Sequence, residues 1–346
     1  MKVGIVGLPN VGKSSLFNLL TSCQAKVDLY PFTTIDKNIG VVAVPDERLK
    51  RIGELLKPEK LTPATIEFVD IAGLVKGASE GEGLGNKFLS YIREVDIILH
   101  LLRTFVSESI PHIYGTIDPA RDKEIVESEL AIADLAILER QIPKLKKEKG
   151  QEKRWELMER VAKELAEGKF PIPLSLDEKD LVKEYNLFSL KEVIYVINHS
   201  EDIFDLKSYP KLKGDFYPIS CSLEEEMRDW REEEKREMRR SLGLKEEGIW
   251  GIVELAFNKL NLIRFYTIKG EETRAWSIKK GTKVIEAAGK IHSDFAQGFI
   301  KAEVLSYEEL LEYKDFHKAR EMGKTKIEGK DYIVRDGDII LIHFRV

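Results

Sequence analysis

The sequence contains little cysteine and no long apolar run. Its 346 residues include two cysteines, Cys23 and Cys221, which are too few and too isolated for a disulfide framework or a zinc site. No apolar segment approaches the roughly 18 residues that a membrane helix needs, and the N-terminal segment reaches Pro9 too soon for the apolar core of a signal peptide. We therefore expect a soluble protein of the reducing cytoplasm that has no membrane partner.

The sequence also lacks an excess of basic charge. Its 55 Lys and Arg residues are outnumbered by 60 Asp and Glu residues, which gives a formal net charge of -5. A general nucleic-acid coat would need a basic face, so any contact with RNA must be local and depend on shape. The hydrophobic fraction of 43%, with 12 Pro and 24 Gly, argues against a disordered or fibrous chain, and the length suggests two or three domains.

Short apolar runs alternate with helical patterns over much of the chain. Buried strands are expected at residues 3–6, 65–69, 97–102 and 193–197, with a weaker one at 215–219. The first four runs are short, rich in β-branched residues and bordered by turn-forming residues. This alternation predicts an α/β fold with a mostly parallel sheet covered by helices.

A pair of helices is expected between two of these strands. Apolar residues recur at helical spacing over residues 122–145 and again over 155–165, and a charged segment at 144–154 connects the two runs. The pattern predicts an inserted, coiled-coil-like antiparallel hairpin. Residues 140–169 hold ten Lys and Arg against six Asp and Glu. A solvated helix face is the simpler explanation of this excess, and a docking surface for an anionic partner is the alternative.

The C-terminal part of the sequence has a different pattern. A densely charged helix is expected over 223–245 and a connecting helix over 251–260. From Leu262 onward the sequence predicts strands at 263–268, 272–277, 299–305 and 339–344, with one helix at 283–291. These elements predict a compact α+β module, whose 16 basic and 14 acidic residues give no electrostatic argument for RNA binding.

A glycine-rich segment follows the first strand and matches G-x-x-x-x-G-K-S without a mismatch. It runs Gly7-Leu8-Pro9-Asn10-Val11-Gly12-Lys13-Ser14 and precedes a helical pattern, which is the context that supports a phosphate-binding loop. The glycines let backbone N–H groups turn toward a phosphate at the start of a helix. Lys13 is expected to bridge the β- and γ-phosphates as a catalytic residue, and Ser14 to bind Mg²⁺. The expected phosphate-binding residues are Asn10, Val11, Gly12, Lys13, Ser14 and Ser15.

Two further motifs indicate a nucleotide-dependent switch. Asp70-Ile71-Ala72-Gly73 ends the expected strand at 65–69 and matches the D-x-x-G of switch NTPases. There the Asp reaches Mg²⁺ and the Gly N–H senses the γ-phosphate. Thr34 lies between the two motifs and is expected to complete the Mg²⁺ shell together with Ser14 and Asp70, although a purely structural threonine is the alternative. This ordered set argues against a small-molecule kinase.

The segment after the strand at 193–197 resembles a base-reading motif but departs from the guanine-specific form. Asn198-His199-Ser200-Glu201 stands where N-K-x-D is usual. Glu201 is one methylene longer than Asp, and a misplaced buried hydrogen bond costs roughly 1–3 kcal/mol. Guanine preference is therefore expected to weaken, and Asn198 with nearby backbone groups could recognise adenine. An ordinary loop is the alternative. Ser220 and Cys221 are expected in the last loop beside the base.

The residue that holds the attacking water is not the usual glutamine. That place is occupied by Leu74, which cannot form a hydrogen bond. His112 follows the strand at 97–102 and is a candidate catalytic residue, although a lone histidine is more often structural. The glycine-rich segment 77–85 is expected to be a mobile switch that becomes ordered around the γ-phosphate.

The combined motifs resemble the YchF/Obg-like ATPase family, in the Obg group of P-loop NTPases. The matching segments are G-L-P-N-V-G-K-S, Y-P-F-T-T-I-D, D-I-A-G-L-V-K-G-A-S, G-E-G-L-G-N and N-x-x-E. Toward the C-terminus, R-A-W-S-I, A-A-G-K-I-H-S-D-F, G-F-I-K-A-E-V and G-K-D-Y-I-V-R-D-G-D-I-I resemble the family's TGS module, a β-grasp fold. The resemblance covers nearly the whole chain and is weakest over 145–192.

The resemblance implies an ATP-preferring, Mg²⁺-dependent hydrolase that associates with the ribosome or its RNA and acts in translation or the stress response. It implies a nucleotide-binding domain at 1–120 and 190–261, a helical insert at 121–189 and a TGS domain at 262–346. It also implies that Asn10 supports a bound monovalent cation such as K⁺ and that His112 corresponds to the family's histidine at the flank of the site.

Departures from the family pattern are Lys37, Glu80 and a short helical segment. The alternatives are an Obg-type GTPase with guanine preference, or a ribosome- or RNA-binding module gated by nucleotide. A monomer is expected.

Overall fold

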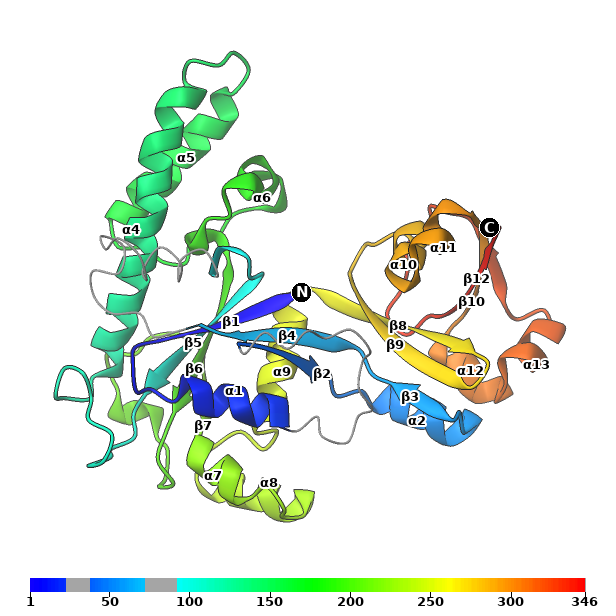
Figure 1. Cartoon of the computed structure of the whole chain (residues 1–346), viewed down its shortest axis with the longest axis horizontal. Helices are drawn as coiled ribbons and strands as arrows, with labels where there is room; N and C mark the ends of the chain where they lie inside the picture. The colour runs from blue at the N-terminus through cyan, green and yellow to red at the C-terminus, as the bar shows by residue number, and fades with distance from the viewer. Residues whose placement is uncertain (23–37, 72–91, 346) are drawn as a thin grey trace. The chain divides into compact units, whose positions relative to one another are not determined.

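A computed structural model describes residues 1–22, 38–71 and 92–345 of the chain (Figure 1). Within these residues the chain forms two compact units. The first comprises residues 1–22, 38–40, 67–71 and 92–252, and the second comprises 41–66 and 253–345. Thr34, Gly73, Leu74, Lys37 and Glu80, which the sequence analysis singled out, lie outside the described residues, as does the glycine-rich segment 77–85.

The first unit is built on a six-stranded sheet with the order β2-β4-β1-β5-β6-β7. Its strands are β1 (Lys2–Val6), β2 (Ile39–Ala43), β4 (Thr65–Asp70), β5 (Ile97–Arg103), β6 (Glu192–Asn198) and β7 (Phe216–Ile219). From β4 to β7 all neighbours are parallel. The five strands expected here are confirmed, and so is the α/β class. Because the carboxyl ends of parallel strands lie at one edge of a sheet, the ends of β1, β4, β5, β6 and β7 lie at the same edge.

Burial explains why these runs form strands. Every residue of β5 is buried, and β1 is buried from its second residue onward. Continuous apolar runs suit a parallel sheet whose two faces are both covered. The helices of this unit are α1 (Lys13–Ser22), α4 (Pro119–Leu145), α5 (Glu152–Ala166), α6 (Leu176–Val182), α7 (Cys221–Glu226) and α8 (Glu232–Ser241), with short 3₁₀ turns at Lys183–Tyr185, Phe188–Leu190 and Leu206–Ser208. Helix α9 (Ile249–Lys259) runs from the first unit into the second.

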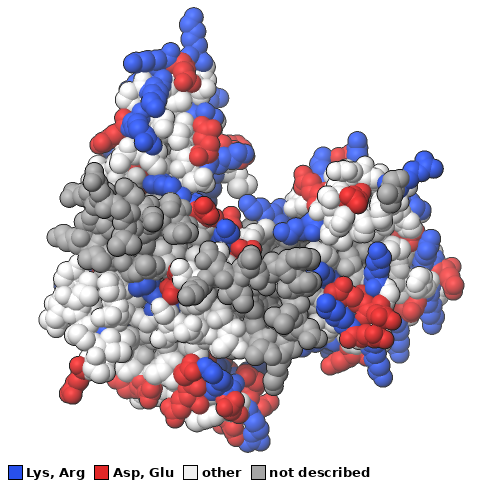
Figure 2. Space-filling view, in the orientation of Figure 1, with Lys and Arg blue, Asp and Glu red and all other residues white. Residues whose placement is uncertain are grey.

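The expected helical hairpin is confirmed as α4 and α5, which extend away from the sheet (Figure 1). Asp118 caps α4 by accepting a hydrogen bond from the N–H of Arg121, and Pro119 occupies the first turn, where no N–H is needed. The two helices share an apolar core that includes Leu138, Met158 and Val161. Basic side chains gather over the far end of the hairpin (Figure 2).

One helix prediction is wrong. The segment 223–245, expected as one helix, forms α7 and α8 with a break between Glu226 and Glu232. The break lets α8 fold back so that Arg239 donates two hydrogen bonds to Glu224, at 2.7 and 2.8 Å, with both side chains buried. Met227, fully buried beside Leu223, anchors the turn. The local charge pattern did not reveal this pairing, because it joins residues 15 positions apart.

The second unit holds another six-stranded sheet, with the order β11-β10-β12-β8-β9-β3. Strands β8 (Leu262–Lys269) and β9 (Glu272–Lys279) form an antiparallel hairpin, and β12 (Ile339–Phe344) pairs with β8 in parallel. The remaining strands are β3 (Lys60–Thr62), β10 (Phe299–Leu305) and β11 (Lys326–Glu328), and the helices are α2 (Glu47–Leu56), α10 (Val284–Ile291), α11 (Ser293–Gln297), α12 (Tyr307–Tyr313) and α13 (Phe316–Glu321). The α+β module expected from Leu262 onward is confirmed, but the expectation of one helix in it is wrong, because α11, α12 and α13 follow α10 within the described residues.

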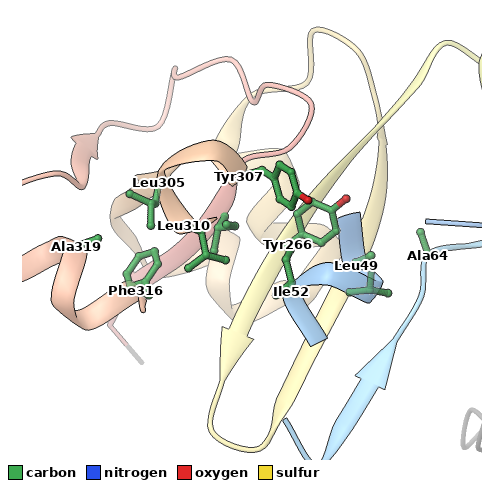
Figure 3. Packing of buried hydrophobic residues seen from close by; sticks show 11 residues of the cluster. Leu49, Ile52, Ala64, Tyr266, Leu305, Tyr307, Leu310, Phe316 and Ala319 are labelled. Atoms are coloured by element: carbon green, nitrogen blue, oxygen red, sulfur yellow. The ribbon is translucent and has the colours of Figure 1, made fainter. Parts of the chain in front are cut away.

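Helix α2 and strand β3 contribute to this second unit although they precede it by about 200 residues in sequence. Leu49 and Ile52 of α2 pack in one apolar cluster with Tyr266, Leu310 and Phe316 (Figure 3). Strand β3 pairs in parallel with β9. Residues 41–66 fall within the range 1–120 that was expected to form the nucleotide-binding domain, so the compact units and the predicted domains divide the chain differently here. No helix of the described residues is long and apolar enough to cross a membrane.

Candidate functional site

The glycine-rich segment forms a tight loop between β1 and α1. Gly7 and Gly12 have φ angles of 155° and 100°, which side chains rarely adopt. A Cβ on Gly7 would lie 2.6 Å from the carbonyl oxygen of Leu101, and one on Gly12 would collide with the side chain of Asn198. The loop therefore needs both glycines to lie this close to β5 and β6, with the start of α1 facing the carboxyl edge of the sheet.

Lys13 and Ser14 open helix α1 and lie beside the end of β4. The Nζ of Lys13 donates a hydrogen bond to the carbonyl of Leu8 at 2.8 Å, and the side chain is almost fully buried. Burial lowers the pKa of Lys13 to about 8, and the negative charge of Asp70 partly opposes this shift. Ser14 Oγ donates to Asp70 Oδ2 at 2.9 Å. The two predicted motifs therefore meet in the structure.

The oxygens of Ser14 and Asp70 fit a magnesium ion. Mg²⁺ prefers hard oxygen ligands and is held by one or two protein groups together with phosphate and water. The second carboxylate oxygen of Asp70 is buried and has no hydrogen-bond partner among the described residues, which leaves it available to a ligand or to water. The described residues contain no group of three or more His, Cys, Asp or Glu side chains that could hold a metal by themselves, so the phosphates of a nucleotide would have to complete the site.

Asn198, at the end of β6, braces the site from within. Its Nδ2 donates to the carbonyl of Val11 at 3.0 Å, and its Oδ1 accepts from the N–H of Cys221 at 3.0 Å. Both ends of the buried amide are thus engaged in joining the phosphate loop to the loop after β7. Asn198 lines the cavity, but its amide can meet a base only through its remaining hydrogen or lone pair.

The side chain of His199 is held by its neighbours, whereas that of Glu201 is exposed. The Nδ1 of buried His199 lies 2.9 Å from Thr104 Oγ1, and its ring packs edge-on against Phe204. Its Nε2 lies 3.0 Å from a carboxylate oxygen of Asp202. Glu201 is exposed, lines the cavity and has no hydrogen-bond or ion-pair partner in the described part of the chain. Glu201 is therefore the free acidic group at this end of the site.

The two residues expected in the last loop are placed differently. Ser220 is fully buried, and its Oγ caps α7 by accepting from the N–H of Leu223 at 3.4 Å, so it supports the loop and does not line the cavity. Cys221 does line the cavity. Burial, with the nearby charge of Glu224, raises the pKa of the Cys221 thiol to about 12, so the thiol stays protonated at neutral pH.

These elements surround a cavity of about 1020 Å³, within the size range of small-molecule sites. Part of this lining was predicted from the sequence, whereas the loop after β5, two positions on α1, two on α7 and one just after α7 were missed. The missed residues are Phe105, Val106, Ser107, Ile110, Asn18, Ser22, Ser222, Glu225 and Arg228. Their signal was positional, because each follows an expected strand or continues the helix after the phosphate loop.

His112 lies apart from this cavity lining. Its Nδ1 accepts from the N–H of Tyr114 at 3.2 Å, so the ring proton is on Nε2, which lies 2.8 Å from Asp122 Oδ2. Arg121 binds the other oxygen of Asp122. His112 is thus not among the residues that line the cavity with Lys13, and its catalytic role stays a prediction. Asn10 Nδ2 donates to the carbonyl of Pro111 at 3.2 Å, and the K⁺ role of Asn10 also stays a prediction.

Comparison with known proteins yields matches over the whole chain. The model of the 50S ribosome-binding GTPases matches residues 2–137, and the model of the YchF GTPase C-terminal domain, described as a protein of unknown function, matches 262–345. The chain is 43% identical to the ribosome-binding ATPase YchF of Haemophilus influenzae over 360 residues, covering 100% of this chain and 99% of that protein. It is 41% identical to the protein of the same name from Bacillus subtilis over 365 residues, covering both in full.

A solved structure also matches. The YchF GTPase of Schizosaccharomyces pombe superposes with a TM-score of 0.84 at 36% sequence identity, over 99% of this chain and 97% of that one. The fold is therefore that of a P-loop GTPase with an added C-terminal unit. These matches agree with the resemblance that the sequence motifs carry.

Proposed function

Because the chain belongs to the YchF family, we propose that it is a magnesium-dependent ATPase that binds the ribosome and acts as a switch in translation or the stress response. The observation that carries the proposal is that Lys13 and Ser14 line the large cavity and that Ser14 is hydrogen bonded to Asp70 at the end of β4. The names of its relatives, which describe ribosome-binding ATPases, supply the ribosome as partner. Cytoplasmic location and a monomeric state remain predictions from the sequence.

The residues of the site divide the work on a nucleotide. Backbone N–H groups of the phosphate loop and the N-terminus of α1 would hold the phosphates, and Lys13 would place its charge against them. Ser14 and Asp70 would hold Mg²⁺, which supplies positive charge to the phosphate oxygens. The two glycines allow the loop to lie close to β5 and β6, and the hydrogen bond from Asn198 to Val11 ties it there, which would keep these donors in place before the nucleotide arrives.

Two features favour ATP over GTP. The guanine-specific motif relies on an Asp that accepts two hydrogen bonds and on a Lys stem that packs on the base. Here His199 is held against Phe204 and Thr104, and Glu201 carries its carboxylate one methylene further out. Phe105 and Val106 add an apolar wall that suits either base and therefore does not restore guanine preference. An Obg-type GTPase is the alternative that these residues disfavour.

The substitution Lys13→Ala tests the proposal. We expect wild-type protein to hydrolyse ATP with Mg²⁺ and to lose that activity with excess EDTA. The variant should lose hydrolysis in both conditions, because the charge opposite the phosphates is gone. Co-sedimentation of wild type and variant with ribosomes, with and without ATP, measures ribosome binding. Normal hydrolysis by the variant would contradict the enzymatic proposal, whereas loss of hydrolysis with unchanged ribosome binding would favour a binding module.

A further inference from the structure

Arg103, the last residue of β5, is a fully buried arginine at the carboxyl edge of the first sheet, with 1% of its surface exposed. Its guanidinium donates hydrogen bonds to three backbone carbonyls. Nη1 donates to Asn10 at 3.0 Å, Nε to Phe105 at 3.0 Å and Nη2 to Ile110 at 2.7 Å. The guanidinium carbon also lies 4.1 Å from the centre of the Phe105 ring. One planar group therefore joins three separate points of the backbone.

The three points belong to the cavity. Asn10 is in the phosphate loop, whereas Phe105 and Ile110 are in the first half of the loop 104–118 between β5 and α4, and all three line the cavity. Val106, between them, is 80% exposed, and Ser107 makes only local hydrogen bonds, with Ser109 and with the N–H of Ile110. Arg103 thus connects the apolar wall of the cavity to the phosphate loop.

Within the described residues, the charge of Arg103 takes part in no ion pair. Across the part of the chain that the structure describes, none of its hydrogen bonds goes to a carboxylate. Burial lowers its pKa, and Asp122 opposes this only through its charge. A buried cation without an ion pair is costly, so the useful property here is the rigid fork of donors. Lysine lacks that fork, because its ammonium is a single point with a different reach.

The phosphate loop has other supports that do not involve Arg103. Asn198 holds the carbonyl of Val11, and Lys13 holds the carbonyl of Leu8. The loop after β5 has fewer links to the phosphate loop among the described residues, namely Arg103 and the hydrogen bond from Asn10 to Pro111. Loss of the guanidinium should therefore displace the wall more than the phosphate cradle.

We propose that Arg103 is a positioning residue that sets the affinity for the base and ribose of the nucleotide, through the wall formed by the loop 105–110, without contacting the nucleotide itself. The inference rests on the proposed nucleotide-binding function. Arg103 would thus affect the binding of the base and ribose and leave the binding of the phosphates largely unaffected. The phosphates are bound by the loop after β1, and the base is bound by a wall whose register Arg103 fixes.

The test compares two ligands on Arg103→Lys. Titration calorimetry with Mg²⁺ measures the dissociation constants of ATP and of inorganic tripolyphosphate, which has no base. We expect ATP to bind roughly ten-fold more weakly, the size of effect that loss of one charge-assisted hydrogen bond produces, and tripolyphosphate to change less than two-fold. KM for ATP should rise by the same factor as the ATP dissociation constant, with kcat within two-fold of wild type.

The matched control is Arg264→Lys. Arg264 also donates to a backbone carbonyl, that of Pro45 at 3.0 Å, and its guanidinium carbon lies 4.1 Å from the Phe257 ring centre, but it belongs to the second unit. Arg264→Lys should leave the dissociation constants of ATP and of tripolyphosphate unchanged. If Arg103→Lys does not fold, Arg103→Gln, which buries no charge, is measured in the same way.

If Arg103→Lys weakened the binding of ATP and of tripolyphosphate equally, or changed the binding of neither, the inference would be overturned. A wild-type protein that binds tripolyphosphate but neither ATP nor GTP would remove the proposed function as well, so the two failures are distinguished by the wild-type titration.

Discussion

Lys13 couples the phosphate site to pH. In the free protein its pKa is lowered to about 8 by burial, whereas bound phosphates would favour its charged form. ATP affinity should therefore be fully present below pH 8 and fall as the pH rises above 8, approaching ten-fold per pH unit. Measuring the ATP dissociation constant from pH 7 to 9.5 tests this. Lys13→Arg stays charged throughout, so its affinity should be flat over the same range, and a flat wild-type profile would contradict the account.

His112 has to leave its hydrogen bonds to act. Its ring is engaged with Asp122 and with the N–H of Tyr114, so a catalytic role requires a rearrangement when nucleotide binds. If it orients the attacking water, His112→Ala should lower kcat roughly 100-fold and leave the ATP dissociation constant near the wild-type value. His292→Ala, which removes an exposed histidine of the second unit, is the control. Unchanged turnover of His112→Ala would exclude the residue from the mechanism.

At single positions, the sequence indicated which residues belong to the phosphate loop, but it did not indicate where individual side chains point. Gly7, Gly12 and Lys13 could be assigned from spacing, because a phosphate loop needs those residue types at those intervals. The direction of Ser220 could not, because a serine after a strand can cap a helix or face a ligand equally well. Asn198 was expected to read the base, and its bracing bonds depend on two loops that come from distant parts of the chain, the loop after β1 and the loop after β7.

At the level of elements, α7 and α8 are held together by a buried ion pair. Glu224 and Arg239 have side chains 5% and 4% exposed. Replacing one partner leaves the other charge buried, so Glu224→Gln should lower the free energy of unfolding by about 3 kcal/mol. Chemical denaturation measures this. Arg240→Gln, which breaks the exposed pair with Glu246, should change stability little. Equal effects of the two substitutions would contradict a special role for the buried pair.

Elements with strong local periodicity were predictable, and those defined by distant partners were not. Helix α5 is amphipathic, apolar residues recur at helical spacing in α4, and polar residues form the turn between them, so both helices follow from local pattern. Strand β3 is three residues long and exists by pairing with β9, more than 200 residues away. Helix α2 is short, and its apolar residues pack on Tyr266 and Phe316. No local pattern indicates which distant element such segments join.

At the scale of the whole molecule, the chain has a P-loop unit with a projecting hairpin and a second α+β unit to which residues 41–66 belong. Because the overall charge is mildly negative, binding to a ribosome would have to use local surfaces of the protein. The basic excess at 140–169 lies on the hairpin, where Figure 2 shows Lys and Arg side chains near its far end. Net charge by itself would not bring the protein to RNA.

The most direct test of the account is a calorimetric titration of the purified protein with ATP and with GTP in the presence of Mg²⁺. The placement of His199 and Glu201 predicts that ATP binds more tightly than GTP. The proposed Mg²⁺ site at Ser14 and Asp70 predicts that removal of Mg²⁺ weakens ATP binding. GTP binding ten-fold tighter than ATP, or ATP binding that is indifferent to Mg²⁺, would contradict it.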